Sequence, residues 1–298
     1  MLTVLITGCN GQLGSELRRL SKDSRCAFCR FLFVNRDVLD ICNRAEVQNY
    51  MKLNKVDVVV NAAAYTAVEK AETEDTELAF AVNRDGVSVL SECCVENNAF
   101  LIHVSTDYVF DGTAHEPYKE NDPVAPVGVY GRSKRAGEEV MKKKGVHGMI
   151  IRTAWLYSAF GNNFVKTMLR LGEEKTQVMV VADQHGTPTW AADLAGAIIE
   201  ILVRTDFSKR QGVEVYHYTN EGECSWFEFA SLIMKLAGKN CEVIPISTSE
   251  YPSSCQRPAY SVLDKTKIKN TFQLNIPEWE DSLQKMLAEM SAASANVD

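Results

Sequence analysis

Residues 4–17, VLITGCNGQLGSEL, place Gly8, Gly11 and Gly14 directly after an apolar run and at the start of a segment that we expect to be helical. Without a Cβ, the first glycine can form a tight turn, the second lets a phosphate approach the backbone, and the third lets the helix pack closely on the strand. The start of such a helix offers free N–H groups and a partial positive charge. Glycines are common at strand–helix turns, but this order of strand, turn and helix favours a site for the pyrophosphate of a dinucleotide.

The first half of the chain alternates short β-branched runs with helical patterns. We expect strands at LTVLITG, FLFVN, VDVVVNAA, FLIHVSTDYVF and GMIIRTAWLY, and helices from about residue 11, near 44–53, in a longer stretch reaching Glu96, and from Tyr130. Strands that are apolar on both faces and separated by helices indicate a parallel sheet covered on both sides. The predicted fold class is α/β, a Rossmann-type doubly wound parallel sheet with a smaller C-terminal substrate-binding part.

The second half is less regular and has no low-complexity linker. It predicts helices near 163–172, 191–203, 226–237 and 281–290, strands at QVMVVAD, EVYHYTN and EVIPIS, and a loop YPSSCQRPAYSVLD. We therefore expect a dinucleotide-binding domain over residues 1–155 and a mainly substrate-binding part over 156–298. The helix and strand within 190–220 are expected to return to the first domain.

Composition excludes several classes of function. The chain has 298 residues, 46% hydrophobic and 24% charged, with a net charge of −7, which gives no support to nucleic-acid or anionic-membrane binding. The N-terminal run LTVLI is too short for a signal peptide or a membrane span. The nine cysteines are scattered, and the CxxC at Cys26 and Cys29 lacks a second pair at zinc-site spacing. The sequence predicts a cytoplasmic protein with reduced thiols.

The residues after the second predicted strand bear on the choice of cofactor. An acidic residue there would bond the ribose 2′-hydroxyl of NAD, whereas an arginine would accommodate the 2′-phosphate of NADP. The chain reads Asn35-Arg36-Asp37. The sequence favours NADPH, and Asp37 leaves NADH open.

Tyr130 and Lys134 lie four residues apart in VYGRSKRAGEEV, so a helix would place them on one face. An isolated YxxxK is more often a surface tyrosine beside a solvated lysine. Here HVSTDYVFDG ends the fourth predicted strand, where open parallel sheets bind their ligands. We expect Ser105 to make only strand-end hydrogen bonds and Thr106 to contact a substrate oxygen.

These residues predict a carbonyl reduction. The nicotinamide hydride would attack a carbonyl carbon, Tyr130 would supply the proton, and Thr106 would bond the same oxygen. Lys134 is expected to lower the pKa of the tyrosine from about 10 and to reach the ribose hydroxyls. The glycine turn, the strand-end threonine and YxxxK follow the order typical of extended short-chain dehydrogenases/reductases.

Longer segments narrow the resemblance. GCNGQLGSEL, VVNAAAYTAVEKAE, STDYVFDG, VYGRSKRAGE, IRTAWLYSAFGNNFVKTM and ADQHGTPTWAADLA resemble the dTDP-4-dehydrorhamnose reductase family. The match runs to about residue 200 and resumes in CQRPAYSVLD and the terminal helix. It implies reduction of the C4 ketone of dTDP-4-dehydro-L-rhamnose to dTDP-L-rhamnose, in nucleotide-sugar biosynthesis for cell-surface polysaccharide.

The resemblance assigns roles residue by residue. It implies catalysis by Thr106, Tyr130 and Lys134. The implied cofactor contacts are Gly8, Asn10, Gly11, Gln12, Leu13, Gly14, Asn35, Arg36, Asp40, Ile41, Ala62, Ala63, Tyr65, Tyr130 and Lys134. The implied substrate contacts are Val68, Thr106, Asp107, Tyr108, Trp155 and Asn163, to which we add Arg257, whose guanidinium suits a diphosphate. Trp155 is equally compatible with a core role, Asn163 with a helix cap, and Arg257 with a surface ion pair.

Some members of the family join subunits through magnesium held by three glutamates. Glu16 and Glu289 match two of those positions, but the third reads Ala192, followed by Asp193. This departure leaves Mg²⁺ in doubt, so no metal ligand is predicted and both glutamates are expected to be solvated. A homodimer stays open.

Two other functions compete with the reductase. A nucleotide-sugar dehydratase or epimerase shares the fold, the tyrosine and the lysine, but a dehydratase needs Asp-Glu after the threonine, and this chain has Asp107-Tyr108. A non-catalytic regulatory subunit would retain the nucleotide fold, and the intact Tyr130, Lys134 and Thr106 argue against it.

Overall fold

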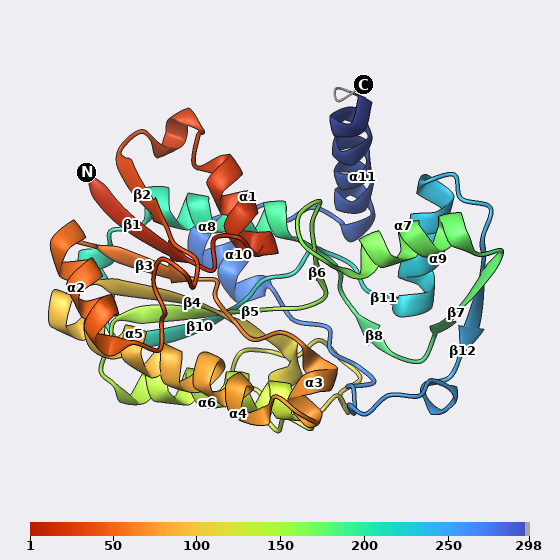
Figure 1. Cartoon of the computed structure of the whole chain (residues 1–298), viewed down its shortest axis with the longest axis horizontal. Helices are drawn as coiled ribbons and strands as arrows, with labels where there is room; N and C mark the ends of the chain where they lie inside the picture. The colour runs from red at the N-terminus through yellow and green to blue at the C-terminus, as the bar shows by residue number, and fades with distance from the viewer. Residues whose placement is uncertain (296–298) are drawn as a thin grey trace.

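The computed structural model describes residues 1–295 and is built around one six-stranded sheet (Figure 1). Neighbouring strands are parallel throughout, in the order β10-β5-β4-β3-β1-β2. The strands are β1 (Leu2–Thr7), β2 (Cys29–Phe33), β3 (Val58–Asn61), β4 (Phe100–Thr106), β5 (Gly148–Thr153) and β10 (Val213–His217). The predicted fold class is confirmed.

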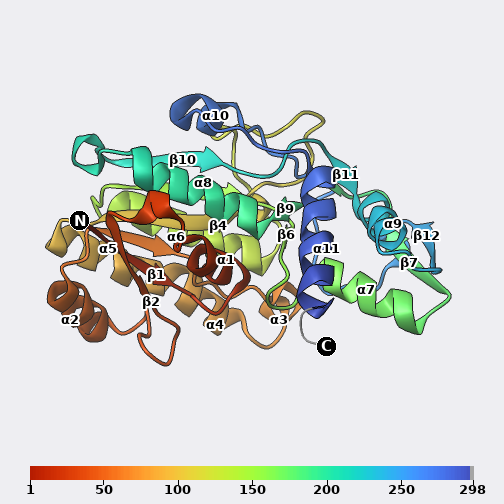
Figure 2. The ribbon, with the colours of Figure 1, turned by 90° about the horizontal axis from the view of Figure 1, so that it is seen from above.

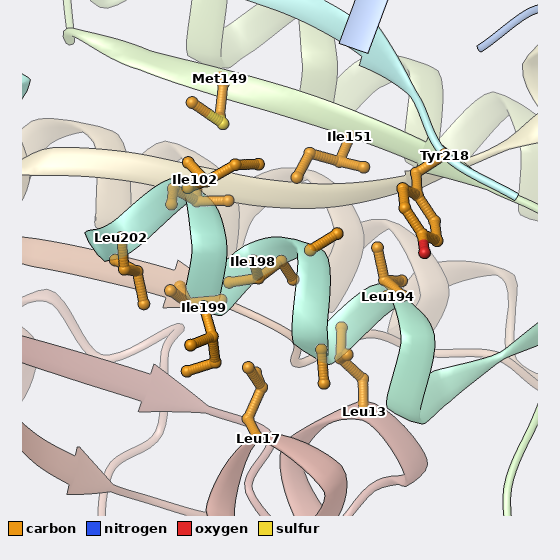
Figure 3. Packing of buried hydrophobic residues seen from close by; sticks show 14 of the residues in the cluster. Leu13, Leu17, Ile102, Met149, Ile151, Leu194, Ile198, Ile199, Leu202 and Tyr218 are labelled. Atoms are coloured by element: carbon orange, nitrogen blue, oxygen red, sulfur yellow. The ribbon is translucent and has the colours of Figure 1, made fainter. Parts of the chain in front are cut away.

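Helices cover both faces of the sheet (Figure 1). Alternate strand residues point to opposite faces, so Val4 and Ile6 join one core cluster and Leu5 the other. The first cluster contains α1 (Gln12–Leu20) and α8 (Ala191–Arg204), and Figure 3 shows the side chains of α8 filling the space between α1 and strands β4 and β5. The second contains α2 (Arg44–Asn54), α5 (Gly86–Asn97) and α6 (Val129–Lys143).

The connection from β5 to β10 crosses the sheet on the face opposite to the two connections before it. The steps from β3 to β4 and from β4 to β5 pass over the face of α5 and α6, whereas α8 returns over the opposite face. Both routes move in the same direction across the sheet, so they have opposite hands, against the strong preference for one hand. The segment between β5 and α8 forms part of a second region.

That second region lies at one end of the sheet (Figure 2). Its core is formed by α7 (Phe164–Glu174), α9 (Trp226–Leu236) and α11 (Trp279–Ala295), with side chains such as Tyr157, Phe229 and Leu283. Three two-stranded sheets complete it: β7 (Gln177–Val181) with β12 (Glu242–Ile246), β6 (Leu156–Tyr157) with β9 (Thr189–Trp190), and β8 (His185–Gly186) with β11 (Cys224–Ser225). A short helix, α10 (Thr266–Phe272), packs on the main sheet instead.

The longer helix expected to reach Glu96 runs from Thr76 to Asn97, but it contains a π-helical turn that the sequence did not predict. The chain forms α3 (Val68–Glu72), α4 (Thr76–Phe80), a π-helical turn (Ala81–Asp85) and then α5. The π turn carries Asn83, which is buried and bonds both backbone groups of Tyr65 and the hydroxyl of Ser133. These bonds satisfy the polar atoms of the buried amide at the irregular turn.

Within residues 1–295, no helix is both long enough and apolar enough to cross a bilayer.

Candidate active site

The glycine turn connects β1 to α1 at the carboxyl end of the sheet. Gly8 has φ +64°, and a Cβ there would lie 2.6 Å from the nitrogen of Ala63. A Cβ on Gly14 would lie 2.4 Å from the oxygen of Gly8. Both positions therefore require glycine. Gly11 is the N-cap of α1, where the first amides of the helix point toward an anion.

A cavity of about 640 Å³ lies between the carboxyl ends of the strands and the second region. It brings Gly11 of the turn together with Thr106, Tyr130 and Lys134, which the sequence placed far apart. The lining residues are Gly11, Gln12, Leu13, Ala62, Ala64, Thr66, Val68, Val104, Ser105, Thr106, Asp107, Tyr108, Tyr130, Lys134, Thr153, Ala154, Trp155, Leu156, Gly161, Asn162, Asn163, Phe164, Trp226 and Arg257.

Tyr130 lies in the first turn of α6, beside Tyr108, whose ring it meets edge-on at 5.8 Å between centroids. Removal from water raises the pKa of its phenol to about 12, although a hydrogen bond with Thr106 acts in the opposite direction. Lys134 is not among the groups that shift this pKa, so the predicted lowering by Lys134 is not confirmed. Tyr130 is therefore a protonated acid at neutral pH.

Lys134 is buried, and burial shifts its pKa in the opposite direction to that of Tyr130. Its Nζ donates to the carbonyl oxygen of Val104 at 2.7 Å, at the end of β4. Burial disfavours the ammonium and lowers the pKa of Lys134 to about 8, while the charge of Glu138 opposes that effect. The ammonium is directed toward the strand end instead of acting on the phenol.

Glu138 is the centre of a buried polar cluster beneath the site. Its carboxylate accepts two hydrogen bonds of 2.8 Å from Arg152 and one of 2.7 Å from Ser105. Burial alone would raise the pKa of Glu138, but the guanidinium of Arg152 holds it below its usual range. Ser105 therefore makes the structural bond expected of it.

Thr106 and Asp107 form a fixed pair at the end of β4. The Thr106 hydroxyl donates to Oδ1 of Asp107 at 3.0 Å and accepts from the amide of Tyr108 at 3.2 Å. Burial raises the pKa of Asp107 to about 6, and hydrogen bonds with Ser261 and Thr106 oppose the rise. Its Oδ2 is buried and has no hydrogen-bond partner within residues 1–295.

Trp155 forms an aromatic wall together with Trp226, a residue that sequence reasoning missed. Trp155 has φ +46°, and its ring stacks on Trp226 at 3.5 Å with an interplanar angle of 11°. A left-handed backbone at a bulky residue costs energy and often marks a functional site. Both indoles line the cavity, so Trp155 is both packed on a neighbour and available to a ligand.

Asn163 and Arg257 approach the cavity from the second half of the chain. Asn163 caps α7 by accepting from the amide of Lys166 at 3.1 Å, and its Nδ2 donates to Oε1 of Gln12 at 3.0 Å. The cap therefore also joins α7 to the glycine turn. Arg257 pairs with Glu69 at 3.0 Å and also lines the cavity.

Comparisons with known proteins agree with this arrangement. A family model described as the RmlD substrate binding domain matches residues 2–292. The chain belongs to this family. A dTDP-4-dehydrorhamnose reductase from Aggregatibacter actinomycetemcomitans is 40% identical over 294 residues, covering 97% of this chain and 99% of the relative. A Bacillus subtilis protein named spore coat polysaccharide biosynthesis protein SpsK is 39% identical over 98% of this chain and 99% of its own.

Solved structures of RmlD-family proteins are similarly close. A dTDP-4-dehydrorhamnose reductase from Clostridium acetobutylicum has a TM-score of 0.90 and 37% identity, covering 97% of this chain and 100% of its own. The enzyme from Bacillus anthracis, solved in complex with NADP, has a TM-score of 0.89 and 39% identity over the same shares of the two chains. A dTDP-glucose 4,6-dehydratase from Streptomyces venezuelae, at 18% identity and a TM-score of 0.79 over 96% of both chains, shares the fold alone. The family predicted from the sequence is confirmed.

Other residues predicted to touch the cofactor lie outside the cavity wall. Within residues 1–295, the lining does not include Gly8, Asn10, Gly14, Asn35, Arg36, Asp40, Ile41, Ala63 or Tyr65. Asn35, Arg36, Asp40 and Ile41 follow β2, which pairs with β1 beside the glycine turn. Asn35 donates to Asp37 at 3.1 Å, and exposed Arg36 lies 3.8 Å from Asp40. These residues lie where the adenosine end of a dinucleotide passes over such a sheet.

The positions that suggested a metal in this RmlD-family chain have other partners. Glu16 is buried and accepts from Ser158 at 2.7 Å and from Arg19 at 2.8 Å, so the expectation of a solvated glutamate is wrong there. Glu289 is half exposed, 3.7 Å from Arg19, while Asp193 bonds Asn220 and Ser282. The described residues contain no group of three or more His, Cys, Asp or Glu side chains able to hold a metal. Mg²⁺ is not supported.

Proposed function

We propose that this chain reduces the C4 ketone of dTDP-4-dehydro-L-rhamnose with NADPH to give dTDP-L-rhamnose. The observation that carries the proposal is the one cavity that brings together Gly11 of the glycine turn, Thr106, Tyr130 and Lys134. Near-full-length relatives named as dTDP-4-dehydrorhamnose reductases support the substrate, and the related structure with NADP supports the cofactor.

The residues present fit a dinucleotide, because Gly8 and Gly14 have no room for a Cβ and so hold the tight turn that brings the start of α1 to the cavity. Bound NADPH supplies a hydride to the carbonyl carbon. Tyr130 then gives its phenolic proton to the ketone oxygen as negative charge develops there, which its high pKa allows at neutral pH. Thr106 orients the same oxygen, while Lys134, held at the end of β4 by its bond to Val104, would reach the ribose hydroxyls of the bound nicotinamide nucleotide.

We further propose that the remaining cavity residues recognise the sugar nucleotide. Asp107 contacts the sugar from the cavity wall beside Thr106, and Trp155 stacks on the sugar. Arg257 binds the diphosphate. Val68, Tyr108 and Asn163 shape the wall around them. In this proposal, the second region supplies the substrate side of the site, and α8 and β10 belong with the dinucleotide-binding part.

The cofactor preference is proposed from the segment after β2. Asn35 carries no charge and Arg36 is exposed beside it, so a 2′-phosphate meets an arginine and not a carboxylate at the leading position. We propose NADPH as the preferred reductant, with the reaction taking place in the cytoplasm. A homodimer stays a prediction.

Steady-state turnover of the purified chain tests the proposal. With dTDP-4-dehydro-L-rhamnose and NADPH, we expect oxidation of one NADPH for each dTDP-L-rhamnose formed. A protein that binds NADPH but does not turn it over would favour a regulatory subunit. Conversion of dTDP-glucose to a 4-keto-6-deoxy sugar without net cofactor consumption would favour a dehydratase, which we disfavour because Tyr108 stands where that chemistry needs a glutamate.

A further inference from the structure

Glu69, on the short helix α3, receives a concentrated set of hydrogen bonds from one distant loop. Its carboxylate accepts from the Ser253 hydroxyl at 2.8 Å, the Ser254 amide at 3.1 Å, the Ser254 hydroxyl at 2.6 Å and Nη2 of Arg257 at 3.0 Å. Burial alone would raise its pKa, but the bonds from Ser254, Ser253 and Arg257 lower the pKa of Glu69 to about 2. The carboxylate is therefore ionised throughout the neutral range.

Glu72, one turn further along α3, ties the same loop to the catalytic helix. It accepts from the amide of Val129 at 2.5 Å, immediately before Tyr130, and lies 3.8 Å from the thiol of Cys255. Two carboxylates of α3 therefore join residues 253–257 to the start of α6. Val68 of the same helix lines the cavity, so this attachment lies at the rim of the site.

Arg257 is held by one edge of its guanidinium only. Nη2 pairs with Glu69, whereas Nε is buried and has no partner within residues 1–295. A planar guanidinium with one edge occupied presents its remaining donors in a fixed direction. Because Arg257 lines the cavity and only its Nη2 bonds Glu69, Nη1 is the donor group left for a diphosphate oxygen.

We propose that Glu69 is a positioning residue for nucleoside-diphosphate binding, which holds the loop 253–257 against α3 and fixes Arg257 with a free edge toward the substrate cavity. The inference rests on the proposed function in that it takes the diphosphate of the sugar nucleotide as the ligand of Arg257. It assigns to Glu69 no contact with the substrate.

An opposite role is conceivable for a carboxylate next to such an arginine. Glu69 would then compete with the diphosphate for the guanidinium and weaken binding. The single bond between Arg257 and Glu69 favours positioning, because it occupies Nη2 and leaves Nη1 for the ligand. A half-exposed ion pair contributes little to stability, so the expected effect of removing it is on affinity and not on folding.

Equilibrium binding of dTDP, measured by titration calorimetry, tests the proposal without requiring turnover. Glu69→Gln keeps the shape of the side chain and removes its charge, and we expect roughly 3- to 10-fold weaker dTDP binding. Arg257→Ala should weaken binding by roughly 10- to 100-fold. Because Glu69 acts through Arg257, adding Glu69→Gln to Arg257→Ala should cost less than about 2-fold more. Thymidine, which lacks the diphosphate, should bind equally to all four proteins.

Glu74→Gln is the matched control, because Glu74 is exposed just after the end of the same helix and pairs only with Lys70 among the described residues. It should leave dTDP binding and thermal unfolding unchanged. Tighter dTDP binding by Glu69→Gln, an additive loss in the double variant, or an equal loss of thymidine binding would overturn the proposal, as would a wild-type chain that does not bind dTDP. If the wild type binds dTDP but does not reduce the keto sugar, the proposed function fails. The positioning role of Glu69 is then judged only by comparing dTDP binding in the two single variants and the double variant.

Discussion

Tyr130 and Lys134 share a face of α6, yet their environments push their proton equilibria in unrelated directions. Desolvation raises the pKa of Tyr130 to about 12, and burial lowers the pKa of Lys134 to about 8. The spacing of the two residues is a local property of the helix. Their protonation depends on β4 and on Glu138, which lie on other turns and strands. The sequence pattern predicts the spacing of the two residues, but it cannot predict their protonation.

Tyr130→Phe removes only the proton that the ketone oxygen needs. We expect turnover to fall by about 10²–10⁴-fold, with NADPH affinity and thermal stability nearly unchanged. Steady-state kinetics and cofactor titration provide the measurement. A variant that keeps more than about a tenth of wild-type turnover, with chemistry still rate-limiting, would remove Tyr130 from the role of proton donor.

Asn35→Asp places a carboxylate where a 2′-phosphate is expected to sit. Charge repulsion and a new bond to the ribose hydroxyl should shift the NADPH/NADH ratio of kcat/KM toward NADH by roughly 10-fold. Steady-state kinetics with each cofactor checks this. If the ratio does not move, Asn35 does not contact the ribose, and Arg36 and Asp37 become the next positions to test.

At the scale of elements, α6 approaches its neighbours so closely that two of its positions have no room for a side chain. A Cβ on Gly131 would lie 2.2 Å from the oxygen of Tyr108, and one on Gly137 would lie 2.1 Å from the oxygen of Asn83. The first contact presses the catalytic helix against the segment that carries Thr106 and Asp107, and the second presses it against the π turn. The relative placement of donor and substrate contacts therefore depends on backbone packing.

Gly131→Ala should destabilise the protein by about 1–3 kcal/mol, because the new methyl group meets backbone instead of a flexible side chain. It should also lower kcat, since Tyr130 moves with the helix. Gly196→Ala on α8 is the control, because no atom lies within 4 Å of the added Cβ. That change should be neutral or stabilising by up to about 1 kcal/mol. Urea unfolding of both variants measures these changes. Equal changes in unfolding free energy for the two variants would contradict the close-packing explanation.

Local patterns predicted most elements of this chain, and the misses have physical causes. The bounds expected for α2 and α8 agree with the structure to within about one residue, since each has a clear apolar face. The interruption of the 68–97 segment depends on the partners that Asn83 finds on Tyr65 and Ser133, which periodicity does not report. Trp226 was missed because its place in the cavity comes from stacking on Trp155, about seventy residues earlier.

At the scale of the whole molecule, a buried polar network joins strands that belong to the two halves of the sequence. Glu138 of α6 pairs with Arg152 of β5, and Arg152 lies 3.4 Å from Nε2 of His217 on β10. His217 donates through Nδ1 to the carbonyl oxygen of Tyr118 at 3.1 Å. Burial, and then the charge of Arg152, lowers the pKa of His217 to about 3, against smaller effects of Tyr118, Glu138 and Asp264.

This shift gives a prediction for stability against pH. The folded-state pKa of His217 lies below its unfolded value of about 6.5, so its contribution is complete above pH 6.5 and is lost as the pH falls toward 3. The loss reaches up to about 1.4 kcal/mol per pH unit. His217→Gln can keep both hydrogen bonds and cannot be protonated, so its urea-unfolding free energy should fall less between pH 7.5 and 5. Exposed His115→Gln is the control, and an unchanged slope in His217→Gln would contradict this explanation.

Residues from both halves of the chain line one cavity. We therefore expect hydride to move from the cofactor bound at the glycine turn to the C4 carbon of the sugar. Reduction with NADPH carrying deuterium at the transferred position of the nicotinamide C4 tests this directly, with the product analysed by mass spectrometry and NMR. We expect one deuterium per dTDP-L-rhamnose, located at C4 of the sugar, and almost none from Tyr130→Phe in the same time. A product without deuterium, or with deuterium at another carbon, would contradict the proposed reaction.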